Sequence, residues 1–280
     1  MNEGHAFVAG FEEDDRLRSA FIRRLVLRHA NLAGSSVVDD TADVLTVPRT
    51  LVRYWHDPDD LPEDVRACLG SWDRLKDHGF EARIFDDASA AEYIGWRYTD
   101  RESEAFRRCR HPAMRSDYLR MCFILAEGGL YVDADDVLVG HGLEKLLVDG
   151  SLKLQPLCYD INASAMAPSE DIWKPSLPRG DRVFYVNNNP LAAASGHPVL
   201  RRALARATAR LLSGEPRPEI QSTTGPGNLT AALAAHAHEL EADGRASDFH
   251  FIRDWNAIAE TRWELSYRHD DRNWRNMDAS

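Results

Sequence analysis

Apolar residues recur at helical spacing near the start of the chain and predict an amphipathic helix over residues 14–32. The apolar positions of this helix are Leu17, Phe21, Ile22, Leu25 and Leu32. Arginines lie between them, so we expect the apolar face to dock on the protein and the arginine face to be solvated; binding to an anionic membrane surface is the alternative. Residues 35–46 read as a linker. The expected organisation is an N-terminal helical extension with its linker over 1–46 and a main domain over 47–280.

Strand and helix patterns alternate in the next part of the chain. Residues 50–55 are β-branched and aromatic, and residues 80–85 alternate between apolar and polar side chains, as strands do. Between them, apolar residues at helical spacing predict a helix that ends at Gly79, with Trp72 on its buried face. A strand, a helix and a strand within so short a stretch predict a βαβ unit and an α/β fold.

An acidic cluster follows the next helix and strand. The helix is predicted over 112–127, where two glycines end it, and residues 130–132 form a short strand of the buried type. Directly after this strand come three carboxylates, Asp133, Asp135 and Asp136. In open α/β sheets, ligands bind beyond the carboxyl ends of the strands, so position and chemistry both indicate a binding site here.

The second half of the chain continues the α/β pattern. Further strands are predicted over 152–159 and 183–186, and further helices over 198–212 and 229–240. The C-terminal tail is unusually rich in Trp, Arg and His.

Composition narrows the class of protein. With 280 residues, of which 44% are hydrophobic and 28% charged, the chain is expected to fold as one main domain. Its net charge of −11 argues against a nucleic-acid-binding protein, because such proteins neutralise phosphates with positive charge. No apolar run is long enough to span a membrane and no signal-like core is seen, so we expect a cytoplasmic protein without a transmembrane segment. The four scattered cysteines favour reduced thiols over disulfides or zinc ligands.

Asp133 and Asp135 can reach one divalent cation, because residues two apart on a strand point to the same face. Carboxylates suit Mg²⁺ or Mn²⁺, and such an ion commonly bridges a nucleotide diphosphate. An exposed turn is one alternative. A phosphatase of the haloacid dehalogenase type, with Asp133 as nucleophile, is another. It is disfavoured because that class carries the motif near its N-terminus and a later Gly-Asp-x-x-x-Asp, whereas Gly180-Asp181 continues as Arg-Val-Phe.

From residue 47 onward, several segments together resemble the DXD-containing glycosyltransferases of family 32, related to the initiating α-mannosyltransferases and to the catalytic domains of clostridial glucosylating toxins. The strongest is RSDYLRMCFILAEGGLYVDADD, residues 115–136, where Ser-Asp-x-x-Arg, an apolar helix, Gly-Gly-x-Tyr and D-x-D stand at the family's spacing. The other matching segments, in the family's order, are VPRTLVRYWHDP, CLGSW, RIFDD, NNNPLAAASGHPVL, TTGPGNLT and RHDDRNW. The resemblance implies a GT-A fold, a Rossmann-like domain that binds a nucleoside diphosphate sugar with Mn²⁺ or Mg²⁺.

The resemblance also implies roles for individual residues. Asp135 would be the direct metal ligand, and Asp133 would hold ribose or sugar hydroxyls with a looser link to the metal. Trp55 would stack on the nucleobase. Asp117 and Arg120 would hold sugar hydroxyls and the negative charge that develops near the leaving diphosphate; a surface ion pair is their alternative.

The tail and one loop complete the implied donor site. Trp274, with Asn273 or His269, would close over the diphosphate, and one of the latter two would stand where the family places a third metal ligand. Asn188 and Asn189 either contact the donor sugar or only shape a turn before a proline.

The resemblance implies transfer of a sugar with retention of anomeric configuration. By analogy with the family alone, the favoured donors are UDP-glucose and UDP-N-acetylglucosamine, with GDP-mannose second, and the acceptor is unknown. Residues 162–181 match nothing in the family and are expected to carry acceptor specificity. A nucleotide-sugar-binding protein without turnover is the alternative from a different functional class.

Overall fold

The computed structural model describes residues 7–32, 46–178 and 180–279. Its α-helices are α1 (Asp15–Leu32), α2 (Glu63–Gly70), α3 (Asp87–Arg97), α4 (Asp100–Arg107), α5 (Pro112–Glu127), α6 (Pro198–Leu212), α7 (Ile220–Thr223), α8 (Pro226–Ala242) and α9 (Trp255–Ile258). Its strands are β1 (Thr50–Tyr54), β2 (Glu81–Phe85), β3 (Gly129–Tyr131), β4 (Asp136–Leu138), β5 (Leu152–Asp160), β6 (Ala165–Met166), β7 (Arg182–Ala193), β8 (Phe249–Phe251) and β9 (Ala259–Thr261).

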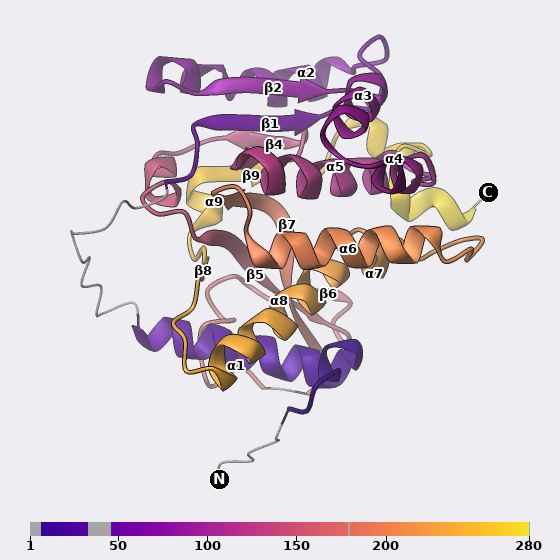
Figure 1. Ribbon diagram of the computed structural model, residues 1–280. Helices are drawn as coiled ribbons and strands as arrows, with labels where there is room; N and C mark the ends of the chain where they lie inside the picture. Colours follow the sequence, from indigo (N-terminus) through magenta and orange to yellow (C-terminus); the bar gives the residue numbers. More distant parts are fainter. Residues whose placement is uncertain (1–6, 33–45, 179, 280) are drawn as a thin grey trace.

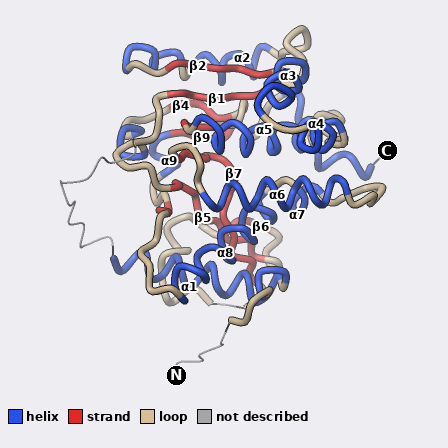
Figure 2. The backbone as a smooth tube through the Cα atoms, in the orientation of Figure 1, coloured by secondary structure: helices blue, strands red, loops and turns tan. Residues whose placement is uncertain are grey.

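A mixed sheet forms the centre of the molecule, with helices packed around it (Figures 1 and 2). Its strand order is β2-β1-β3-β7-β5-β6, and β8 pairs with β5. The strand β1 runs parallel to β2 and β3, whereas β7 runs antiparallel to β3 and β5. The expected α/β class is confirmed.

The sheet register decides which segments meet at the acidic cluster. Because β1 and β3 are parallel, their carboxyl ends reach the same edge, where Asp133 follows β3. Tyr131 of β3 pairs with Leu191 of the antiparallel β7, so the residues just before Leu191 run alongside Asp133. A small second sheet pairs β4 with β9 and brings the C-terminal part of the chain to the same edge.

Local signals explain the helix that leads to this edge. His111 caps α5, since its Nδ1 accepts a hydrogen bond from the amide of Ala113 at 3.0 Å. Gly128 and Gly129 end the helix with φ angles of 73° and 116°. A Cβ atom on Gly129 would lie 2.7 Å from the carbonyl oxygen of Thr50, so only glycine lets β3 approach β1 so closely.

The sequence pattern missed, merged or shortened several elements. The single helix expected to end at Gly79 is divided into α2 and a 3₁₀ segment, Asp73–His78, although Trp72 is buried as expected. The helices α3 and α4 were not expected. The strand predicted over 183–186 is the much longer β7, in which three consecutive asparagines, residues 187–189, interrupt the apolar run.

The N-terminal helix α1 docks on β7 and α8, as Figure 1 shows at the end of the molecule opposite β2. Its buried residues include Phe21, Ile22, Leu25 and Val26, which belong to the largest core cluster. The expected docking of the apolar face is confirmed, and Arg28 on the polar face pairs with Glu241 at 2.7 Å. Residues 35–45 of the expected linker lie outside the described residues, and no helix among those described is long and apolar enough to cross a membrane.

Candidate active site

A cavity of about 810 Å³ opens at the carboxyl ends of β1 and β3. Its walls include the end of β1, helix α5, the acidic segment after β3, the strands β5 and β7, the loop after β6, the segment around α7, and the C-terminal part of the chain from α9 onward. Of the residues singled out from the sequence, it brings together Trp55, Asp117, Arg120, Asp133, Asp135, Asn188, Asn189, Asn273 and Trp274. His269 is exposed and does not line the cavity.

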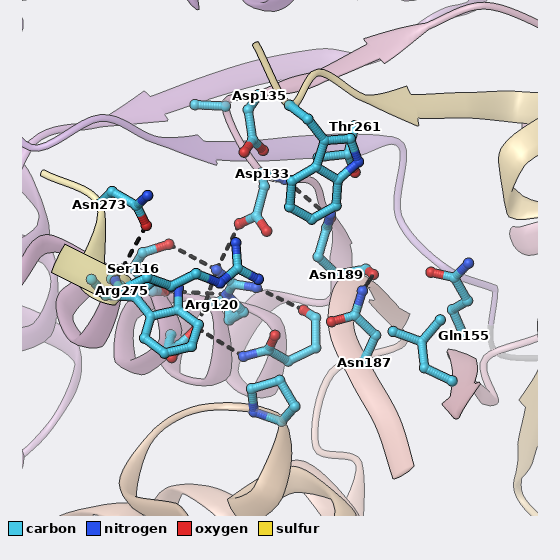
Figure 3. A pocket seen from close by; sticks show the side chains of 18 of the residues that line it. Ser116, Arg120, Asp133, Asp135, Gln155, Asn187, Asn189, Thr261, Asn273 and Arg275 are labelled. Atoms are coloured by element: carbon cyan, nitrogen blue, oxygen red, sulfur yellow. Dashed lines mark hydrogen bonds and ion pairs between the residues drawn. The ribbon is translucent and has the colours of Figure 1, made fainter. Parts of the chain in front are cut away.

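An ion-pair network lies on the wall of the cavity, with Arg120 and Asp117 buried and Asp133 partly exposed. Nη2 of Arg120 lies 2.7 Å from Oδ1 of Asp133 and 3.2 Å from Oδ1 of Asp117. Figure 3 shows Asp133 and Arg120 pointing toward one another. Arg120 is 3% exposed and Asp117 7%, so the alternative of a surface ion pair is wrong.

Burial and neighbouring charges act in opposite directions on these groups. Burial raises the pKa of Asp117 to about 6 despite the attraction of Arg120. Burial also disfavours charge on Arg120, but Asp133, Tyr131 and Asp117 outweigh it and raise the pKa of the guanidinium above its ordinary value. Arg120 therefore remains charged, and its positive charge is fixed in a position facing the cavity.

Two asparagines of β7 brace the network. The side-chain amide of Asn188 donates to Oδ1 of Asp117 at 2.7 Å, and the backbone carbonyl of Asn188 accepts from Nη1 of Arg120 at 2.9 Å. Asn189 accepts from the amide of Asp133 at 3.1 Å and donates to Oδ2 of Asp136 at 2.9 Å. These bonds fix the carboxylates and the arginine in one geometry, whereas contact of either asparagine with a donor sugar stays a prediction.

Arg53 and Trp72 donate hydrogen bonds to the backbone of the acidic segment. Nη2 of the buried Arg53 donates to the carbonyls of Asp133 and Asp136 at 2.6 and 3.2 Å, and Trp72 donates to the latter carbonyl at 2.9 Å. The guanidinium carbon lies 5.3 Å from the Trp72 ring centre, and burial lowers the pKa of Arg53 to about 10. Arg53 was not expected at the site, because a single arginine inside a strand carries no sequence signal.

The carboxylate of Asp135 already has partners from the tail. Its Oδ2 accepts a hydrogen bond from the hydroxyl of Tyr267 at 2.8 Å and forms a short ion pair with Arg268. Burial, and secondarily the negative charge of Asp133, raise the pKa of Asp135, whereas Arg268 opposes this shift. Neither Tyr267 nor Arg268 was singled out from the sequence.

Trp55 and residues of the C-terminal tail also line the cavity. Trp55 is 8% exposed, donates from Nε1 to the carbonyl of Asp60 at 3.1 Å and packs edge-on against Tyr267 at 5.3 Å. Asn273 donates to the carbonyl of Arg268 at 2.9 Å and accepts from the amide of Arg275 at 3.3 Å. The stacking role of Trp55 and the metal role of Asn273 stay predictions.

The carboxylate oxygens of Asp133 and Asp135 are chemically suited to bind a divalent cation. Asp133 and Asp135 place two hard oxygen ligands on the wall of one cavity, and the repulsion between them is relieved by a positive charge. In the described ranges no cluster of three or more His, Cys, Asp or Glu side chains is arranged to hold a metal. Further ligands would therefore be amide or hydroxyl oxygens of the protein, water, or oxygens of a bound diphosphate.

One region of the chain matches a known family. Residues 62–149 match the family described as "Glycosyltransferase sugar-binding region containing DXD motif". The chain carries a DXD glycosyltransferase region. This region contains Asp117, Arg120, Asp133 and Asp135, and the expectation of a glycosyltransferase enzyme is confirmed. The assignment to family 32 stays a prediction.

Other comparisons are more distant. No curated protein matches the sequence of the chain. Among solved structures, the chain is similar to one titled "PaToxG Glycosyltransferase", with 15% sequence identity and a TM-score of 0.47 over 83% of this chain and 82% of that chain. The mixed sheet with flanking helices is consistent with the expected GT-A-like fold.

Proposed function

We propose that this glycosyltransferase moves a hexose from a nucleoside diphosphate sugar to an acceptor hydroxyl. The observation that carries the proposal is the ion-pair network of Asp133 with the buried Asp117 and Arg120, next to Asp135 on the wall of one large cavity. Buried charges at a cavity wall are costly unless they are paired, and they typically mark a functional site. The network also lies inside the region that matches the glycosyltransferase family.

Each residue of the network has a distinct part in the proposed reaction. Asp135 and Asp133 would hold Mn²⁺ or Mg²⁺, which neutralises charge on the diphosphate when it is bound. Arg120 would stabilise the negative charge that develops on the leaving diphosphate, because its guanidinium is fixed and charged before the substrate arrives. Trp55 would hold the nucleobase at the cavity mouth. The favoured donors remain UDP-glucose or UDP-N-acetylglucosamine, followed by GDP-mannose.

Retention of anomeric configuration is part of the proposal. Of the carboxylates that line the cavity, Asp117 is the most buried, and its partners are Arg120, Asn188 and the hydroxyl of Thr224, which donates at 3.2 Å. A carboxylate held by three partners is poorly placed to attack an anomeric carbon. These contacts support a front-side substitution in which the acceptor hydroxyl and the leaving diphosphate meet the same face of the sugar.

The acceptor would enter from the side of the loop that follows β5. Met166, Ala167, Pro168 and Ser169, within the segment expected to carry acceptor specificity, line the cavity. The hydroxyl of Tyr185 on β7 lies against the sulfur of Met166 at 3.6 Å. This wall is mostly apolar, in contrast to the charged wall around Asp133, and the contrast supports separate positions for acceptor and donor.

A ligand screen tests the donor half of the proposal. A nucleotide at about 100 times its Kd adds roughly 2.7 kcal/mol to the stability, so UDP or GDP with Mn²⁺ should raise the melting temperature by several degrees. Release of nucleoside diphosphate from the matching sugar nucleotide then separates an enzyme from a binding protein without turnover. If none of the tested nucleotides and sugar nucleotides stabilises the protein, with or without Mn²⁺, the proposal is wrong.

A further inference from the structure

The carboxylate of Asp135, which is expected to bind a metal, already forms an ion pair with an arginine of the protein. Oδ2 of Asp135 forms its ion pair with Arg268, and both side chains are 12% exposed. A divalent cation that binds this carboxylate therefore meets a guanidinium already in place. Because Oδ2 of Asp135 already accepts from both Tyr267 and Arg268, a metal bound to this buried carboxylate repels the guanidinium and favours its departure.

The surroundings of Arg268 leave room for such an exchange. Its guanidinium stacks on the exposed ring of Trp263, 4.6 Å from the ring centre, and lines the cavity. Its Nε atom is buried and has no hydrogen-bond partner among the described residues. A buried donor without a partner is unfavourable, so Arg268 is incompletely satisfied in this position and gains from a new acceptor in the cavity.

The backbone of the segment is held independently of this ion pair. The amide of Ser266 donates to Oδ2 of Asp64 at 2.6 Å, and Arg272 pairs with Asp60 at 2.9 Å. The carbonyl of Arg268 accepts from the side-chain amides of Asn273 and Asn276 at 2.9 and 3.2 Å. The exchange thus needs only rotation of a side chain and no release of the tail.

We propose that Arg268 is an exchangeable counter-ion of Asp135, which yields this carboxylate to a divalent cation and then binds a diphosphate oxygen of the donor. The inference rests on the proposed function for the identity of that diphosphate. A guanidinium suits both partners, since its planar fork pairs with carboxylate and with phosphate oxygens. Arg268 is thereby assigned as a diphosphate-binding residue.

The exchange couples the metal to the nucleotide. The metal alone must displace Arg268 without offering it a new partner, whereas a diphosphate supplies one. Each ligand then raises the affinity for the other by the same factor, as linkage requires, and couplings of this kind are typically about 5-fold to 150-fold.

Titration of Mn²⁺ into the full chain without nucleotide tests the exchange directly. Arg268→Gln keeps a polar side chain of similar reach but removes the competing charge, so it should bind Mn²⁺ at least about 10-fold more tightly than the wild type by calorimetry. Arg275→Gln is the matched control, because Arg275 lies in the same cavity and over the same Trp263 ring but makes no ion pair with Asp135. Its affinity for Mn²⁺ should equal that of the wild type.

Addition of UDP or GDP completes the test. The nucleotide should raise the affinity for Mn²⁺ strongly in the wild type and less in Arg268→Gln. Equal affinities of wild type and Arg268→Gln for Mn²⁺ alone, or no binding to either, would overturn the inference. If Arg268→Gln does not fold, Arg268→Lys is tested in its place. The lysine ammonium pairs with Asp135 less well than the planar guanidinium does, so the variant should bind Mn²⁺ more tightly than the wild type. An affinity no higher than that of the wild type overturns the inference.

Failure of this inference can be told apart from failure of the proposed function. The titration with Mn²⁺ alone needs neither donor nor turnover. An active transferase whose Mn²⁺ affinity is unaffected by Arg268→Gln contradicts only the counter-ion role. If Arg268→Gln binds Mn²⁺ more tightly as predicted but the protein binds no nucleoside diphosphate, the counter-ion role stands. In that case only the proposed function and the assignment of Arg268 as a diphosphate-binding residue are contradicted.

Discussion

Arg120→Lys is the most informative substitution, because it keeps the positive charge and removes the geometry. The arginine distributes its donors over the carbonyl of Asn188, the hydroxyl of Ser116 and the carboxylate of Asp133, at 2.9, 2.8 and 2.7 Å. A lysine ammonium is a single point with a shorter reach and cannot serve all three. Charge at the site is retained while its position relative to the leaving diphosphate changes.

These contacts set the expected effects of Arg120→Lys on the stability of the protein and on kcat. Loss of two hydrogen bonds to neutral acceptors costs about 1 kcal/mol each, which gives a stability loss of roughly 2 kcal/mol. Loss of a fixed donor to charge that develops in the transition state typically lowers kcat about 100-fold or more. Because that charge is smaller in the bound donor, KM for the donor should change much less.

Steady-state hydrolysis of the sugar nucleotide, measured beside the melting temperature, separates catalysis from folding. Arg115→Lys is the matched control on the same helix, because Arg115 pairs with Asp87 at 2.7 Å but does not line the cavity. It should lower the melting temperature slightly and leave kcat within a few-fold of the wild type. An unchanged kcat in Arg120→Lys, with a lower melting temperature, would refute the assignment of Arg120 to the leaving group.

Three further substitutions test other parts of the site and the fold. Asp135→Asn should abolish Mn²⁺-dependent binding of UDP or GDP while circular dichroism stays unchanged; full affinity by calorimetry contradicts the metal assignment. The protein should not hydrolyse p-nitrophenyl phosphate, and robust hydrolysis that Asp133→Asn removes would favour the phosphatase alternative instead. Burial lowers the pKa of His29 from 6.5 to about 4, so the folded protein favours the neutral imidazole. The contribution of this neutral form to the free energy of unfolding is fully present above about pH 6.5 and is lost as the pH falls toward 4. His29→Gln should reduce the loss of stability between pH 7 and pH 4, measured by urea titration, by no more than about 3 kcal/mol. His56, His111, His197 and His250, whose pKa values burial also lowers, still contribute to the loss in the variant. An identical loss in the variant and the wild type shows that His29 does not contribute.

The sequence by itself determined the elements that local signals specify. Apolar spacing, Pro112 at the first turn and the two glycines after Glu127 define α5 without reference to the rest of the chain. The same helix places Asp117 and Arg120 one turn apart on one face, and the short strand after it leads directly into Asp133. The chemistry of the candidate site was therefore visible in a single continuous segment.

Only the tertiary structure decided what surrounds these groups. Asn189 reaches Asp133 because β7 runs antiparallel to β3, and Arg268 reaches Asp135 because β9 pairs with β4, contacts that join residues 56 and 133 positions apart. Arg53 lies in an apolar strand with no pattern to mark it, yet it holds the backbone of the acidic segment. Periodicity and capping act over a few residues, whereas sheet register and charge pairing act across the fold. For this reason the sequence indicated the candidate side chains of the site, and the folded chain decided which partners surround them.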